Sequence, residues 1–110
     1  MALVGRWPGD DELTERRHHV GRTGAKIKST LEYFDIPVSE VHLTNMLLCK
    51  PVGKLPKGGL KMALDACLPR VWRELQTTGS EVILAADKYA LRGLTGKVSL
   101  KDWMGVRLEP

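Results

Sequence analysis

The sequence predicts a three-layer α/β/α fold around a short parallel sheet. Apolar segments typical of strands alternate with segments whose apolar residues recur at helical spacing, in the order strand, helix, strand, helix, strand, helix. Such alternation favours right-handed crossovers and a parallel sheet that is covered by helices on both faces. The length of 110 residues fits one small domain.

The first half of the chain supplies two strands and one helix. Residues 2–5 form the first predicted strand, and a turn-like Gly-Arg-Trp-Pro-Gly segment follows it. A helix is expected from residue 24, and Pro37 closes it. Its apolar positions at helical spacing are Ile27, Leu31 and Phe34. Residues 41–45 form the second strand, and residues 46–59, rich in Pro, Gly and Lys, form a long loop.

The second half of the chain supplies a long helix, a strand and a short helix. One face of the long helix consists of Leu60, Leu64, Cys67, Val71 and Leu75. Pro69 is expected to kink or divide this helix, and Gly79 is expected to end it. Residues 82–86 form the third apolar strand, and Asp87 is well placed to cap a short helix that runs to about Arg92.

The composition is that of a folded, soluble domain with a modest positive charge. Seventeen Lys and Arg against thirteen Asp and Glu give a formal net charge of +4, which is compatible with nucleic-acid binding. The basic residues form two clusters, Arg16, Arg17, Arg22, Lys26 and Lys28, and Lys50, Lys54, Lys57 and Lys61. Because the sequence has no membrane-span or signal-peptide pattern, we expect a cytoplasmic protein with no membrane partner.

Polar groups follow the first two predicted strands, where parallel sheets bind ligands beyond their carboxyl ends. Asn45 ends the second strand and Arg6 to Gly9 follow the first, so the two loops are expected to face one crevice. A carboxamide has a hydrogen-bond donor and an acceptor on one face, which matches the O4 acceptor and the N3–H donor of uracil. A fixed amide in that orientation rejects cytosine, whose donor and acceptor are reversed. A helix cap or a satisfied strand end is the ordinary alternative role for Asn45, and a plain turn is the alternative for the loop.

Three other patterns are weaker indications of function. The segment Gly21–Lys26 lacks the spacing of a phosphate-binding P-loop, although the helix N-terminus after it still favours a phosphate. The adjacent His18 and His19 point in different directions on most backbones and have no third metal ligand at a recognisable spacing. The two Cys do not indicate a disulfide framework; they either pack or bind metal.

Five segments, in order, carry the pattern of a known family. A strand with Gly5-Arg6-Trp7-Pro8-Gly9 resembles the family's strand with Gly-Glu-Ala-Pro-Gly, and His18-His19-Val20-Gly21-Arg22-Thr23-Gly24 resembles Pro-Phe-Val-Gly-Arg-Ala-Gly. Thr44-Asn45 with Cys49 and Pro51 is similar to the family's strand ending Thr-Asn, which is followed by a Cys and a Pro. Cys67-Leu68-Pro69-Arg70-Val71 resembles the family's Cys-Arg-Pro-Tyr-Leu helix. Residues 82–96 resemble its Val-Ile-Val-Ala-Leu-Gly strand and the following helix.

That family is the uracil-DNA glycosylase superfamily. The similarity is closest to its iron–sulfur branch, usually called family 4, and to the glycosylase-like domains of some phage DNA polymerases. The resemblance implies that the target nucleotide is flipped into a pocket, where Asn45 reads uracil and His19 takes the place of a stacking phenylalanine.

The resemblance also implies where chemistry and DNA contacts lie. The loop beside the scissile N-glycosidic bond, where water attacks a sugar with oxocarbenium character, would consist of Gly5, Arg6, Trp7, Pro8 and Gly9, with Asp10 after it. The DNA phosphates would be held by Arg22, Lys50, Lys54 and Lys57.

The chain departs from the family at the catalytic and metal positions. Arg6 stands where the family has Glu, and a guanidinium cannot act as a general base, which leaves Asp10 or Asp11 as the alternative. No His follows His42, so the family's later His-Pro-Ser motif is unmatched. Cys49 and Cys67 match two of four cluster ligands, so we expect a four-iron cluster in a longer form and none in this chain.

We therefore expect a fold of the uracil-DNA glycosylase type, shortened at both ends, in which residues 1–110 form one partial, monomeric domain. The predicted function is hydrolysis of the N-glycosidic bond of uracil in single- or double-stranded DNA, as in base excision repair. The alternative is a glycosylase-like DNA-binding module without turnover, associated with phage replication. An unrelated small α/β binding domain is the third hypothesis.

Overall fold

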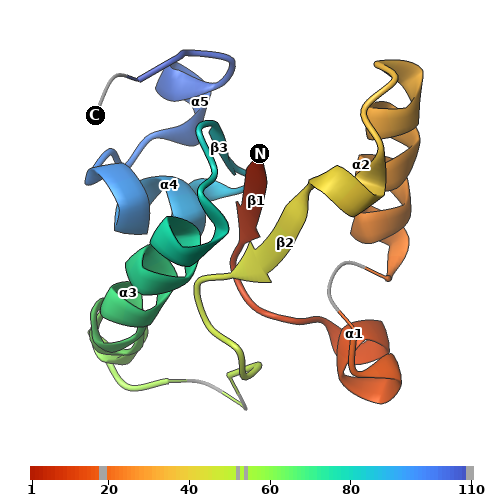
Figure 1. The fold of residues 1–110 in the computed structure, drawn as a ribbon. Helices are drawn as coiled ribbons and strands as arrows, with labels where there is room; N and C mark the ends of the chain where they lie inside the picture. The colour runs from red at the N-terminus through yellow and green to blue at the C-terminus, as the bar shows by residue number, and fades with distance from the viewer. Residues whose placement is uncertain (18–19, 52, 54, 109–110) are drawn as a thin grey trace.

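Three parallel strands form the central sheet (Figure 1). The structure is a computed structural model that describes residues 1–17, 20–51, 53 and 55–108. The strands are β1 (Ala2–Gly5), β2 (His42–Asn45) and β3 (Ile83–Ala85), and their order in the sheet is β2-β1-β3. The predicted parallel sheet is therefore confirmed, with β1 between its two neighbours.

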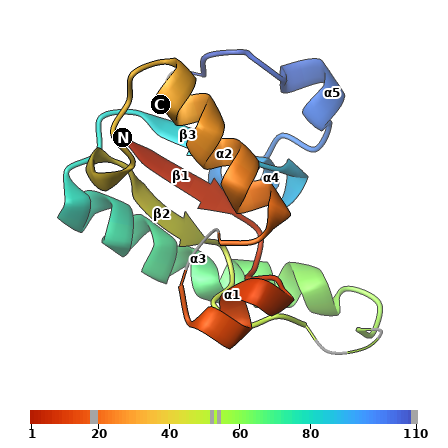
Figure 2. The same cartoon turned by 90° about the vertical axis from the view of Figure 1, so that its right-hand side faces the viewer.

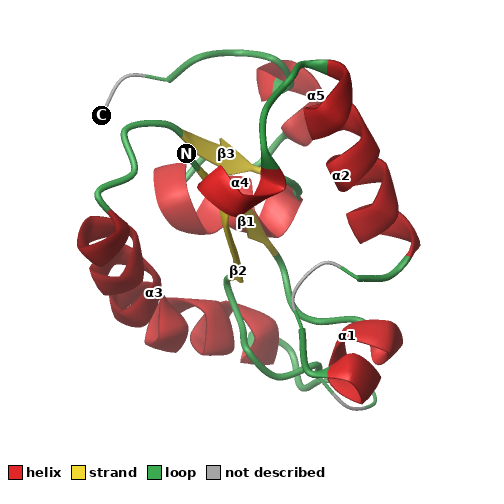
Figure 3. Cartoon of the chain, turned by 45° about the vertical axis from the view of Figure 1, so that its right-hand side comes forward, coloured by secondary structure: helices red, strands yellow, loops and turns green. Residues whose placement is uncertain are grey.

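Helices occupy most of the rest of the described chain (Figure 3). They are α1 (Asp10–Glu15), α2 (Arg22–Tyr33), a 3-10 helix η1 (Val38–Glu40), α3 (Gly59–Thr78), α4 (Lys88–Thr95) and α5 (Leu100–Trp103). The sequence patterns predicted α2, α3 and α4 but neither of the short helices α1 and α5. Three acidic residues in the first turn of α1 favour that helix, because negative charge is stabilised at a helix N-terminus.

Side chains that alternate along β1 divide the core between two layers of helices. Ala2 and Val4 are fully buried and belong to a cluster with residues of α3 and α4, such as Leu75. Leu3 points the other way and belongs to a cluster with Leu31 of α2. Figures 1 and 2 show α2 on one side of the sheet and α3 with α4 on the other. The predicted three-layer α/β/α architecture is confirmed.

The termini of α3 and α4 follow the local sequence signals. Gly79 ends α3 with a φ of 64°, a left-handed conformation that favours glycine. The Asp87 carboxylate accepts hydrogen bonds from the amides of Tyr89 and Ala90 at 3.0 and 2.9 Å, so it caps α4 as predicted. The helix continues past the expected end at Arg92 to Thr95.

Two local expectations need correction. Pro69 does not divide the second predicted helix, because α3 is continuous from Gly59 to Thr78, although Figure 3 shows α3 bent along its length, in agreement with the expected kink. Leu64 on one side of Pro69 and Val71 on the other are both buried in the same core cluster, so both halves of the helix pack against the core. Phe34 does not extend the apolar face of α2; its side chain is 65% exposed. No helix among the described residues is long and apolar enough to cross a bilayer.

Candidate functional site

The carboxyl ends of β1 and β2 are joined by their backbones. The amide of Met46 donates to the carbonyl of Gly5 at 2.8 Å, and the amide of Leu47 donates to that of Arg6 at 2.8 Å. The parallel pairing thus continues for two residues beyond Asn45. The structure brings together the two loops that the sequence analysis assigned to one crevice.

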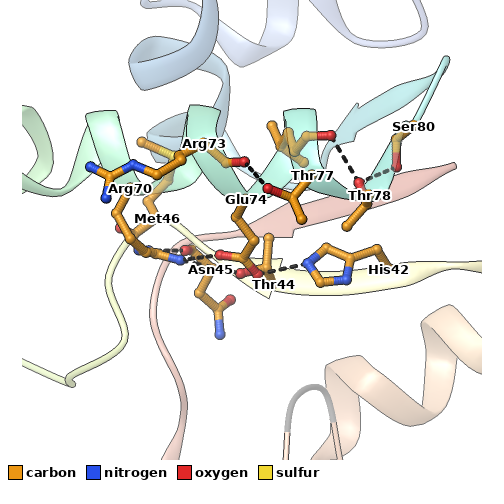
Figure 4. Close-up of polar contacts among 11 residues, drawn as sticks. His42, Thr44, Asn45, Met46, Arg70, Arg73, Glu74, Thr77, Thr78 and Ser80 are labelled. Atoms are coloured by element: carbon orange, nitrogen blue, oxygen red, sulfur yellow. Dashed lines mark hydrogen bonds and ion pairs between the residues drawn. The ribbon is translucent and has the colours of Figure 1, made fainter.

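Asn45 is almost fully buried at this junction. Its residue surface is 2% exposed, and the register places it beside Gly5. Its neighbour Thr44 faces α3, so alternation directs Asn45 toward the opposite, α2 side of the sheet. Figure 4 shows the carboxamide of Asn45 pointing away from α3. Burial restricts the orientations open to this carboxamide, and recognition of a base edge requires a single orientation.

Arg70 of α3 holds the same strand end from the other side (Figure 4). Its Nη2 atom donates to the carbonyl oxygens of Asn45 at 2.7 Å and of Met46 at 2.9 Å. Its Nη1 atom donates to Glu74 Oε2 at 2.6 Å and lies 3.4 Å from Thr44 Oγ1. One guanidinium therefore binds two consecutive carbonyls and a carboxylate, which its planar fork of donors allows.

Glu74 connects Arg70 back to the start of β2. Its Oε1 atom lies 2.6 Å from His42 Nε2. Partial burial raises the pKa of Glu74, but hydrogen bonds from His42, Thr44 and Arg70 and the charge of Arg70 outweigh burial and lower this pKa below its ordinary value of 4.5. Glu74 is therefore a carboxylate at neutral pH and holds Arg70 in place.

The loop after β1 carries an exposed cation on an aromatic pair. The guanidinium carbon of Arg6 lies 4.9 Å from the ring centroid of Trp7, and that ring lies 5.2 Å from the ring of Tyr89. Lys88 Nζ lies 5.1 Å from the centroid of Tyr89. Cation–π contacts of this length restrict both cations. The result is a positively charged, partly aromatic surface beside the carboxyl ends of β1 and β3.

Glu12 organises the other side of this loop. Gly9 is the N-cap of α1, and a Cβ atom on Gly9 would lie 2.9 Å from Glu12 Oε2. The amide of Gly21, the N-cap of α2, donates to Glu12 Oε1 at 3.1 Å. Sequence reasoning missed Glu12, although a Glu three residues after an N-cap is a known signal. The Gly21 amide, in a region where a phosphate was expected, has this carboxylate as its partner.

A cavity of about 340 Å³ lies between α2 and β3 on the face toward which Asn45 points. Leu3, Ile27, Leu31 and Leu84 form its apolar part, and its other lining residues are Arg22, Thr23, Lys26 and Thr30. Asn45 does not line it, so this cavity and the Asn45 junction are separate features.

A comparison with protein families decides the assignment. The model of the uracil DNA glycosylase superfamily matches residues 1–107. The chain belongs to this superfamily. The match includes both strand ends described above and the whole of α3 and α4, so this is a glycosylase-like domain. Membership of the iron–sulfur branch stays a prediction.

Within this glycosylase-like domain, the residues predicted to contact DNA phosphates differ in position and in ion pairing. Arg22 is the exposed first residue of α2, and Lys57 is exposed in the turn before α3. Lys50 forms an ion pair with Asp10, with Nζ to Oδ1 at 2.7 Å, which links the loop after β2 to α1. The predictions for His19 and Lys54 fall on residues outside the described part of the chain.

The two cysteines do not make a four-ligand site. Cys49 is exposed in the loop after β2, whereas Cys67 is half-buried and packs against the core from α3. Within residues 1–17, 20–51, 53 and 55–108, no group of three or more His, Cys, Asp or Glu could hold a metal ion. A four-iron cluster requires four ligands, so we assign no step of the chemistry to one.

Proposed function

We propose that this glycosylase-like domain binds uracil-containing DNA, extrudes the deoxyuridine and hydrolyses its N-glycosidic bond. The observation that carries the proposal is the buried Asn45 carboxamide at the carboxyl end of β2, bonded through its neighbour Met46 to the Gly5 loop. The superfamily match supports DNA as the partner and the glycosidic bond as the reacting group.

Recognition rests on the two polar atoms of the Asn45 carboxamide. The NH₂ group donates to uracil O4, and the carbonyl oxygen accepts from N3–H. Cytosine has a donor and an acceptor in the reversed positions, so a carboxamide that cannot rotate leaves both pairs unmade. Positive charge for the DNA phosphates comes from Arg6 and Lys88, which lie over the paired aromatic rings. Arg22 and Lys57 add to it.

Hydrolysis requires a water molecule, a base and support for the leaving group. The bond from the water oxygen to C1′ forms as the bond from C1′ to N1 breaks, and the electron pair of that bond stays on uracil. Arg6 cannot accept the proton of the water. Asp10, the first carboxylate after the Gly5, Arg6, Trp7, Pro8 and Gly9 loop, takes that role in our proposal. The Asn45 amide donor stabilises the uracil anion.

A second candidate function is DNA binding without turnover. The specific observation in its favour is Arg6, a cation at the family's glutamate position, held over Trp7. A cation there strengthens phosphate binding and supplies no base. Recognition of uracil by Asn45 is common to both candidates, so the test of recognition and the test of turnover are separate experiments.

Recognition is tested by binding of oligonucleotides that contain one 2′-fluoro-2′-deoxyuridine or one 2′-fluoro-2′-deoxycytidine. The fluorine withdraws electrons from the oxocarbenium-like sugar and prevents hydrolysis, so affinities are measured on intact DNA. Asn45→Asp removes the donor to O4, and we expect the preference for uracil to fall by about tenfold or more. Gln76→Glu, the same amide-to-acid change at an exposed position of α3, is the control. Unchanged uracil preference in Asn45→Asp would remove Asn45 from the site.

A further inference from the structure

Two consecutive carbonyls at the end of β2 share one donor group. The carbonyl oxygens of Asn45 and Met46 both accept from Arg70 Nη2, at 2.7 and 2.9 Å. The Met46 amide donates in the other direction, to Gly5 on β1. The backbone around Asn45 is therefore fixed from α3 on one side and from the neighbouring strand on the other.

Arg70 itself has little freedom to move. Its second nitrogen, Nη1, is bonded to Glu74 at 2.6 Å, and Glu74 is bonded to His42 at 2.6 Å (Figure 4). The Arg70 side chain is 29% exposed, so solvent competes for these bonds only in part. His42 and Asn45 are the first and last residues of β2. The chain of contacts starts and ends on the strand that carries the recognition amide.

We infer that Arg70 is a positioning residue that fixes the Asn45 carboxamide and thereby sets the discrimination between uracil and cytosine. The inference rests on the proposed function. Arg70 contacts the backbone of Asn45, and the carboxamide points to the opposite side of the sheet, so Arg70 touches no base. A displacement of about 1 Å of a positioning or reacting group costs as much as 100-fold in catalytic efficiency. The effect of Arg70 on the position of Asn45 is therefore expected to exceed the free energy of the Arg70 hydrogen bonds themselves.

The contacts of Arg70 with two carbonyls and a carboxylate are a feature of this chain and not of the family motif that its segment resembles. In that motif, Cys-Arg-Pro-Tyr-Leu, tyrosine stands at the position of Arg70. A tyrosine has one O–H donor and cannot bind two carbonyls and a carboxylate together. The presence of Glu74 one turn later, at the i,i+4 spacing that suits an ion pair, gives the guanidinium its partner.

The test uses three variants and the two 2′-fluoro oligonucleotides. Arg70→Lys keeps the charge and the ion pair but lacks the fork that reaches both carbonyls. Arg70→Met removes the donors altogether, and Arg73→Met removes an exposed arginine one turn away on the same helix. We expect a loss of uracil preference of about tenfold in Arg70→Lys, a larger loss in Arg70→Met, and none in Arg73→Met. Affinity for the cytosine oligonucleotide should stay unchanged in all three.

The outcomes separate this inference from the proposed function. Wild-type protein with equal affinity for both oligonucleotides would overturn the proposed function and this inference with it. A wild-type preference for uracil that persists in folded Arg70→Lys would overturn the role of Arg70 alone. Arg70→Lys is the decisive variant if Arg70→Met fails to fold. Equal losses of affinity for both bases would also overturn the inference, because they indicate a structural or phosphate-binding role.

Discussion

Lys50 Nζ lies 2.7 Å from the Oδ1 atom of Asp10, so an ion pair joins the loop after β2 to the first turn of α1. Asp10 begins α1, after the loop that follows β1, and Lys50 lies in the loop that follows β2, so both segments leave the same end of the sheet. The pair also offsets the charge of a lysine that the sequence assigned to DNA phosphates. A phosphate that binds Lys50 competes with Asp10 for the donors of its ammonium group.

Substitution of Asp10 should therefore change binding and turnover in opposite directions. In Asp10→Asn, Lys50 becomes available to a phosphate, so DNA affinity should rise and the slope of log affinity against log salt should steepen by about one. Uracil excision should fall about 100-fold or more, because the proposed base is lost. Asp65→Asn breaks the exposed pair with Lys61 on α3 and controls for net charge. Equal salt slopes in both variants would contradict the role of the ion pair.

Arg6 is expected to contact a phosphate rather than to act in proton transfer. Arg6→Gln should weaken binding to all oligonucleotides alike and reduce the salt slope by about one. The preference for uracil over cytosine should remain as in the wild type, since Asn45 is untouched. Arg73→Gln removes the same charge from an exposed position on α3 and should leave the slope unchanged. A loss of uracil preference in Arg6→Gln would show that Arg6 takes part in base reading.

The lowered pKa of Glu74 predicts a loss of stability in acid. The carboxylate is favoured in the folded state, so its contribution is fully present above the unfolded pKa near 4.5 and is lost as the pH falls through the lower folded pKa. The free energy of unfolding, measured by urea titration between pH 3 and pH 7, should decline below about pH 4.5. Glu74→Gln should flatten this decline, whereas Glu32→Gln on the exposed end of α2 should not. Identical curves for the wild type and Glu74→Gln would refute the assignment.

The Asp87 cap on α4 leads to a prediction about stability that does not depend on the proposed function. Asp87→Ala leaves two amides at the start of α4 without their acceptor and should lower the free energy of unfolding by about 1 kcal/mol. Ser99 caps α5, a helix of four residues, through a longer bond of 3.4 Å. Ser99→Ala should therefore cost less than Asp87→Ala in the same thermal or urea measurement, and the reverse order would contradict the capping geometry.

Features encoded within a few residues could be predicted from the sequence. Asp87 and Gly79 mark helix ends through their own hydrogen bonds and backbone conformation, and alternating strands and helices indicate a parallel sheet. The placement of Asn45 at a strand end belongs to the same class, because it needs only the strand boundary. Such signals are local, so tertiary contacts do not obscure them.

Contacts between distant segments could not be predicted in this way. Arg70 and Asn45 are 25 residues apart, and His42 and Glu74 are 32 apart, so no spacing in the sequence pairs them. The continuity of α3 through Pro69 likewise depends on packing against the sheet, which outweighs the local preference to break. The pairing of Asp10 with Lys50 follows only once both loops are placed at one end of the sheet.

Turnover is tested by excision of uracil from a labelled single-stranded oligonucleotide that contains one deoxyuridine. The protein is used in catalytic amounts, and abasic sites are revealed by alkaline cleavage. We expect several uracils to be released per protein molecule, and no base to be released from an oligonucleotide with deoxycytidine at that position. Salt-sensitive binding of the same oligonucleotide with no abasic sites formed would contradict the claim of turnover and assign the chain to DNA binding alone.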